Sequence, residues 1–331
     1  MTPPAAPTPT PVFLLSLPRA GSTLVQRVLA ASGEVATTPE PWILLPQLYA
    51  LRERGIAADY GQIPASRAIR EFAGRLPGGQ DAYDAEVRAF AERLYRRAAA
   101  GGARYFLDKT PRYHLIVEDL FRVFPDARFL FLWRNPLAVA ASIVDTWGRG
   151  RWIVDRYRID LVDGVDNLVR AYEGHRSNAT AVRYEDLVAE PGTAWPRLFG
   201  ALEIPFDPTV LERFPEVRLD ARMGDPTGTK RYAELSTEPL EKWRSTLRGS
   251  VRIRWARAYL ERLGRDGLAA MGYDLEELRG QLEGLRGAPA RTGSDLLRAG
   301  YARRTTARRR RAMEALQRRR GRGSEGPDHR P

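Results

Sequence analysis

The fold of this chain is constrained most by the alternation of short apolar runs with segments of helical spacing. Residues 11–17 form a nearly continuous apolar run, which is typical of a strand buried on both faces. Apolar residues then recur at helical spacing over 24–29. Further strands are expected at 104–108, 128–133 and 179–183. A helix is expected from the apolar stripe over 113–124, and another is expected to begin near Pro136. This alternation predicts an α/β fold with a central parallel sheet and helices on both faces.

Polar and charged residues follow three of the expected strands directly. The segments that contain them are residues 18–23, 109–111 and 134–142. Because ligands of open parallel sheets bind beyond the carboxyl ends of the strands, we expect these segments to converge on one crevice. The mostly helical segments 41–103 and 148–176 are expected to cover and shape that crevice.

Composition excludes several kinds of site. The chain has no cysteine and three histidines, so disulfides and thiolate chemistry are excluded and a zinc site is disfavoured. The first ten residues lack the pattern of a signal peptide, and no long apolar window follows. We therefore expect a cytoplasmic protein without a transmembrane segment. The expected organisation is a disordered leader over 1–10, one α/β domain over 11–286 and a basic tail over 287–331.

The positive charge is concentrated in the tail. Residues 291–331 hold 13 arginines and 4 acidic residues, which accounts for +9 of the formal net charge of +12. Such a tail is able to contact an anionic surface or nucleic acid, and the alternative is a solvated, partly helical extension. The chain has only three lysines, at positions 109, 230 and 242. Each is a candidate for a place where a compact charge is needed.

The turn at residues 18–23 favours an anion. A tight strand-to-helix turn directs backbone N–H groups and the positive end of the helix at one place. Ser22 and Thr23 add hydroxyl donors, and Arg19 adds a permanent charge. The turn lacks the first glycine and the lysine of G-x-x-x-x-G-K-[ST], so an ordinary nucleoside triphosphate loop is disfavoured. A capped helix without any ligand is the structural alternative.

Four segments occur in the order and at the intervals typical of one family. They are LPRAGSTL (17–24), FLWRNPLAVAASIV (131–144), VRYEDLVAEP (182–191) and LEKWRS (240–245). The first resembles the 5′-phosphosulfate loop, and the second the 3′-phosphate segment, of sulfotransferases that use 3′-phosphoadenosine 5′-phosphosulfate (PAPS). The resemblance covers about residues 11–250. It implies a P-loop-like three-layer fold, PAPS as co-substrate and no requirement for a metal.

The resemblance also implies which residues bind the cofactor. They are Arg19, Ala20, Gly21, Ser22, Thr23, Leu24, Arg134, Ser142, Tyr184 and Lys242. Arg134 and Ser142 correspond to the 3′-phosphate pair, although a surface arginine and an ordinary helical serine fit the sequence as well. Tyr184 fits either a place near the adenine or a place in the core.

The loop that closes over the nucleotide is harder to locate. It is expected within residues 224–242, where Lys242 best matches the family pattern. Thr227, Thr229 and Lys230 are the alternatives.

Lys109, in the segment FLDKTP, follows an expected strand. The resemblance implies that it contacts the bridging or sulfuryl oxygens of the donor, and the alternative is a surface lysine. With Arg19 it would neutralise the charge that builds on the leaving phosphate during transfer.

The base that takes the acceptor proton has two candidates. Small-molecule sulfotransferases carry a histidine two residues after the lysine, but here that position is Pro111. The segment TTPEPWILL resembles tyrosylprotein-type and many bacterial sulfotransferases, which makes Glu40 the candidate carboxylate. An exposed loop glutamate is the alternative interpretation. His114 is the other candidate base, although its place in an expected helix favours a structural role.

These observations predict in-line transfer of a sulfuryl group from PAPS to a hydroxyl or amine acceptor, with Arg19, Lys109 and Glu40 as catalytic residues. Two rival hypotheses are open. One is a phosphotransferase that uses ATP and magnesium, for which Asp108 and Asp145 are the nearby acidic residues. The other is a nucleic-acid-binding module that acts through the arginine-rich tail.

Overall fold

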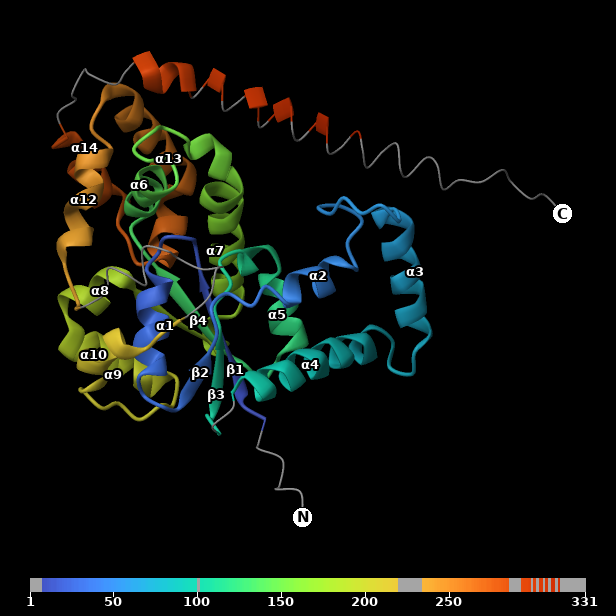
Figure 1. Cartoon of the computed structure of the whole chain (residues 1–331). Helices are drawn as coiled ribbons and strands as arrows, with labels where there is room; N and C mark the ends of the chain where they lie inside the picture. The colour runs from blue at the N-terminus through green and yellow to red at the C-terminus, as the bar shows by residue number, and fades with distance from the viewer. Residues whose placement is uncertain are drawn as a thin grey trace.

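The computed structural model describes residues 8–99, 102–219, 234–285 and 293–298, with residues 300, 301, 304, 305, 307, 308, 311, 312 and 315 beyond them. Five strands form one sheet in the order β2-β3-β1-β4-β5, and every neighbouring pair is parallel (Figure 1). The strands are β1 (Thr10–Ser16), β2 (Val35–Thr37), β3 (Tyr105–Asp108), β4 (Arg128–Trp133) and β5 (Ala179–Arg183). The predicted α/β fold with a central parallel sheet and helices on both faces is confirmed.

Helices connect the strands and surround the sheet. Those before β4 are α1 (Ser22–Ala30), α2 (Leu44–Tyr49), α3 (Gln62–Arg75), α4 (Gly79–Ala98), the short 3-10 helix η1 (Tyr113–Leu115) and α5 (Val117–Val123). Between β4 and β5 lie α6 (Pro136–Thr146), η2 (Val154–Tyr157), the π-helix η3 (Ile159–Gly164), α7 (Val165–Gly174) and η4 (Arg176–Asn178). After β5 come α8 (Tyr184–Ala189), α9 (Pro191–Ala201), α10 (Val210–Arg213), η5 (Phe214–Glu216), α12 (Glu238–Thr246), α13 (Ser250–Ala270) and α14 (Leu275–Glu283).

The core lies on both faces of the central strands. Residues 12–15 of β1 are fully buried, as are residues 129–132 of β4 beside them. The ring of Phe13 packs edge-on against Phe124 at 5.0 Å and stacks with Phe129 at 5.7 Å between centroids. Burial on both faces explains why these strands read as continuous apolar runs rather than alternating ones.

The structure differs from the sequence-based expectations at three elements. β1 begins at Thr10, one residue inside the expected leader. β2 has only three residues and was not predicted, because so short a strand has no readable period. The helix expected from the stripe over 113–124 is divided at Ile116, whose φ of −128° and ψ of 19° separate η1 from α5. The helix expected near Pro136 does begin there, capped by the side chain of Asn135.

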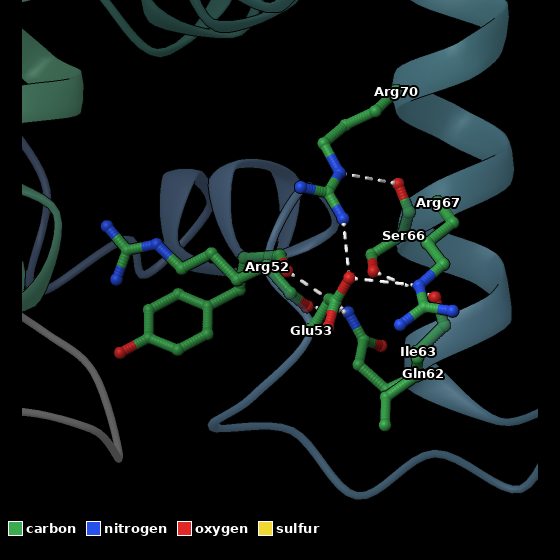
Figure 2. Close-up of polar contacts among 8 residues, drawn as sticks. Arg52, Glu53, Gln62, Ile63, Ser66, Arg67 and Arg70 are labelled. Atoms are coloured by element: carbon green, nitrogen blue, oxygen red, sulfur yellow. Dashed lines mark hydrogen bonds and ion pairs between the residues drawn. The ribbon is translucent and has the colours of Figure 1, made fainter. Parts of the chain in front are cut away.

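The segment that connects α2 to α3 makes polar contacts with α3 (Figure 2). Glu53 Oε1 accepts hydrogen bonds from Arg67 Nε (3.0 Å) and Arg70 Nη2 (2.9 Å) on α3. These contacts are exposed, so they stabilise the fold little. The buried side chain of Gln62 donates to the carbonyl oxygens of Tyr49 (3.1 Å) and Arg52 (2.8 Å). This amide therefore holds the start of α3 against the end of α2.

Within the described part of the chain, no helix combines the length and the apolar character needed to cross a bilayer.

Candidate active site

The turn between β1 and α1 depends on Gly21. Gly21 has a φ of 97°, in the left-handed region that favours glycine. A Cβ atom at this position would lie 2.3 Å from Cδ2 of Tyr184, so the close packing of that ring also requires a glycine. The first hydrogen bond of α1 runs from Leu24 N to Gly21 O (3.0 Å). The positive end of α1 therefore opens at Ser22 and Thr23, where an anion is stabilised.

Arg134 follows β4 and lies against this turn. Its Nη1 donates to the carbonyl oxygen of Arg19 (3.0 Å), and its Nη2 donates to the carbonyl oxygen of Pro239 at the start of α12 (3.1 Å). The guanidinium carbon lies 4.4 Å from the ring centroid of Tyr184. Arg134 Nε is buried and has no hydrogen-bond partner among the described residues. A buried donor of this kind is costly unless a ligand satisfies it.

Ser142 on α6 connects the predicted anion-binding segment 134–142 to the turn at residues 18–23. Its Oγ accepts a hydrogen bond from Arg19 Nε at 3.3 Å. Arg19 has a φ of 69°, a backbone conformation that few residues other than glycine adopt. The strained turn directs the Arg19 side chain towards α6, and the two segments therefore form one continuous cationic surface.

Lys109 and Glu40 form an ion pair although they are 69 positions apart in the chain. Lys109 Nζ lies 2.9 Å from Glu40 Oε1, and their side chains are 4% and 12% exposed. The indole Nε1 of Trp42 donates to Glu40 Oε2 at 3.4 Å. Glu40 and Trp42 both have positive φ angles, 21° and 59°. The loop that carries the carboxylate is thus held in a strained conformation by its surroundings.

Asp108, at the end of β3, organises those surroundings. Its Oδ2 accepts hydrogen bonds from the hydroxyls of Tyr95 (2.7 Å) and Tyr113 (2.9 Å), and its Oδ1 accepts one from Thr110 (3.0 Å). Thr110 Oγ1 in turn accepts from the backbone N–H of Trp42 at 3.2 Å. One fully buried carboxylate therefore ties α4, η1 and the Glu40 loop to the strand end that precedes Lys109.

Burial raises the pKa of Asp108 from 3.8 to about 6, although its three hydroxyl donors and nearby Lys109 act in the opposite direction. The folded protein therefore favours the protonated form of Asp108 more than the unfolded chain does. The free energy of unfolding that this group contributes at low pH is lost as the pH rises through about 6.

The substitution Asp108→Asn removes this ionisation. Between pH 4 and 7.5 we expect the unfolding free energy to change in favour of the variant, relative to the wild type, by roughly 2 kcal/mol. Urea unfolding at several pH values measures this, and a constant difference between the two proteins would contradict it.

His114 lies in η1 and is buried. Its Nε2 lies 3.3 Å from Oδ1 of Asp160, which is also fully buried, and its Nδ1 has no hydrogen-bond partner among the described residues. Asp160 also accepts from Arg112 Nε (3.2 Å) and Nη2 (3.3 Å). His114 thus lies behind Arg112 and does not line the pocket described next.

A pocket of about 540 Å³ lies between the turn, Arg134 and the Lys109–Glu40 pair. It is lined by Pro18, Arg19, Gly21, Ser22, Thr23, Glu40, Trp42, Lys109, Pro111, Arg112, Arg134, Trp147 and Tyr157. Arg112, Trp147 and Tyr157 line the pocket although no sequence pattern predicted them there. The rings of Trp147 and Tyr157 lie 4.8 Å apart and form an aromatic wall. The available signal was Trp147, three residues after the 3′-phosphate segment, but spacing alone does not show which way its ring faces.

The other predicted site residues lie around the pocket or away from it. Ala20 and Leu24 are buried under the turn. Tyr184 is also buried, and supports both Gly21 and Arg134. Lys242 is on the exposed side of α12 and does not line the pocket. Thr227, Thr229 and Lys230 lie outside the described residues.

The two acidic residues named for a magnesium site are engaged elsewhere. Asp108 is saturated by its three hydroxyl donors, and Asp145 Oδ2 accepts from Thr246 Oγ1 at 2.7 Å. Over the described ranges, no three His, Asp or Glu side chains gather in a way that could hold a metal ion. Asp108 and Asp145 therefore do not form a shared magnesium site of the kind that the phosphotransferase hypothesis names.

Comparisons with known proteins point to one family. The family model described as the sulfotransferase family matches residues 11–208. The nodulation protein NoeE of Sinorhizobium fredii (strain NBRC 101917 / NGR234) is 30% identical over 297 residues, covering 81% of this chain and 67% of that protein. The solved sulfotransferase domain from the Synechococcus PCC 7002 olefin synthase matches in fold with a TM-score of 0.53 at 24% identity. That match covers 82% of this chain and 98% of the domain.

Proposed function

The chain belongs to the sulfotransferase family, which uses PAPS as sulfuryl donor, and on that premise we propose that the 540 Å³ pocket is its active site. The pocket lies at the carboxyl ends of β1, β3 and β4, where ligands of parallel sheets bind. The acceptor is a hydroxyl or, as the alternative, an amine that enters on the side of Glu40.

The donor lies across two anion sites. The turn at residues 18–23 and the start of α1 hold the 5′-phosphosulfate, and Arg134 with Ser142 holds the 3′-phosphate. The position of Arg134 is the observation that supports this most directly. Its guanidinium contacts the backbone of the turn, so the two anion sites are adjacent, and its buried Nε still lacks a partner within the described structure.

Transfer proceeds by in-line displacement. The acceptor oxygen forms a bond to sulfur while the bond from sulfur to the 5′-phosphate oxygen breaks, and 3′-phosphoadenosine 5′-phosphate (PAP) leaves with that electron pair. Arg19 and Lys109 stabilise the negative charge that builds on the leaving oxygen. Glu40 takes the proton of the acceptor hydroxyl. Lys109 and Glu40 are paired with each other, so each side chain is held in a defined orientation at the pocket.

Asp108 positions this pair without touching a substrate. It is the common partner of Thr110, which receives the N–H of Trp42, and of Tyr113, whose hydroxyl receives the N–H of Leu44 at 3.4 Å. Both ends of the segment that follows Glu40 are therefore tied to the strand that carries Lys109.

Arg134→Ala tests the placement of the donor. Its loss removes a charge-assisted contact to the 3′-phosphate, so we expect PAP to bind about 10- to 100-fold more weakly. Isothermal titration calorimetry with PAP and with adenosine 5′-phosphate measures the effect. The variant should lose the wild-type preference for PAP, because only PAP carries the 3′-phosphate.

Arg197→Ala is the matched control, because Arg197 is exposed on α9 and does not line the pocket. It should bind PAP as tightly as the wild type. Retention of full PAP affinity by Arg134→Ala would contradict the proposed donor site.

A further inference from the structure

The basic C-terminal segment is fixed to the domain by a buried ion pair. Asp295, in the helical stretch 293–298, accepts hydrogen bonds from Arg252 Nε (2.7 Å) and Nη2 (3.2 Å). Arg252, on α13, also donates to the carbonyl oxygens of Thr246 (2.7 Å) and Gly150 (3.0 Å). A buried bidentate pair of this kind is strongly disrupted by loss of either partner. The segment therefore starts from a defined point on the domain.

Large apolar side chains follow this point and face the solvent. Leu296 is 50% exposed, Leu297 is 78% exposed and Tyr301 is 63% exposed. The domain leaves these side chains in water although apolar surface is stabilised by burial. Exposed apolar groups that are close together and next to charges are typical of an interaction surface.

Arginines continue on the same side. Leu297 and Tyr301 are followed by Arg304, Arg308 and Arg311 at intervals of three or four residues, and the five described residues are helical and exposed. This spacing places them along one side of a helix. Figure 1 shows the described residues of this segment, in red, leading away from the body of the domain. The side is apolar near the domain and cationic farther out.

We propose that the described helical residues between 293 and 315 bind the surface of an anionic lipid bilayer. In this arrangement Leu296, Leu297 and Tyr301 insert at the level of the headgroups, while the arginines contact lipid phosphates and carboxylates. Residues 291–331 supply a net charge of +9 for this attraction. Nucleic acid would use the arginines but gives the two leucines no partner. The apolar residues therefore favour a lipid surface.

Sedimentation of the full-length protein with phospholipid vesicles tests this interaction. We expect at least tenfold stronger binding to vesicles of phosphatidylcholine with 30% phosphatidylserine than to phosphatidylcholine alone, and weaker binding as the salt concentration rises. The triple variant R304Q/R308Q/R311Q should bind the anionic vesicles at least tenfold more weakly. L296S/L297S should lose at least fivefold, because the apolar contribution is separate from the charge.

The matched control is R254Q/R257Q/R265Q, which removes the same charge from exposed positions of α13. It should retain binding within about twofold, and circular dichroism and PAP binding should show that all variants remain folded. Equal binding to both kinds of vesicle would overturn the proposal, and so would wild-type binding by L296S/L297S. Binding to a 20-base-pair DNA duplex that displaces the vesicles and ignores the leucine substitutions would identify nucleic acid as the partner instead.

Discussion

Glu40→Gln is expected to lower kcat by about 10²- to 10⁴-fold while PAP affinity stays within about threefold of the wild type. Glutamine retains an oxygen that can accept from Lys109 or Trp42, but it does not take up the acceptor proton. Single-turnover assays with labelled PAPS and an acceptor found by screening a metabolite extract measure the rate, and calorimetry measures PAP binding. Loss of both activity and PAP binding would indicate a structural defect instead.

The same assay distinguishes the two candidate bases. His114→Asn should lower the rate much less, because His114 faces Asp160 behind Arg112 and does not line the pocket. Glu53→Gln is the control for removal of a carboxylate, since Glu53 contacts Arg67 and Arg70 on α3 and does not line the pocket. A Glu40→Gln enzyme with wild-type turnover would rule out Glu40 as the base.

Lys109→Met is expected to lower the transfer rate by about 10²- to 10³-fold. Methionine keeps most of the apolar stem but removes the charge that stabilises the sulfuryl and bridging oxygens in the transition state. PAP lacks the sulfuryl group, so its affinity should change by less than about fivefold. Comparing single-turnover rates with PAP dissociation constants separates the two effects.

Arg197→Met is the matched control for Lys109→Met, because it removes a charge from an exposed position outside the pocket. It should leave both quantities unchanged. If Lys109→Met weakened PAP binding as much as it slowed transfer, Lys109 would be a general nucleotide contact instead of a transition-state one.

The strands and the turn at residues 18–23 could be predicted from sequence because their signals are local. A continuous apolar run identifies β1 and β4, and the small residues after β1 identify the turn. The ion pair between Lys109 and Glu40 was not predicted as a contact, because no local pattern relates residues 69 positions apart. Asp108 was considered only as a metal ligand, since its hydroxyl partners on α4 and η1 are visible only in the folded chain.

The residues by which the helical segments 41–103 and 148–176 shape the pocket were less predictable than the strands of the sheet. Hydrophobic spacing indicates that a segment is helical, but not which of its polar or aromatic residues faces a pocket. Arg112, Trp147 and Tyr157 were therefore missed as lining residues. The tail illustrates the same limit, because its charge is plain in the sequence while the pairing of Asp295 with Arg252 requires the fold.

Helices α3 and α4 form a helical hairpin, which is joined to Asp108 by the hydroxyl of Tyr95 near the C-terminal end of α4. Helix α3 and the start of α4 precede Tyr95 in the sequence and form the outer part of this hairpin. Changes in the outer part of this helical hairpin are thus separated from the atoms that perform the transfer. Exchange of residues 60–90 between relatives should accordingly leave the rate of transfer within the pocket unchanged, because none of these residues lines it.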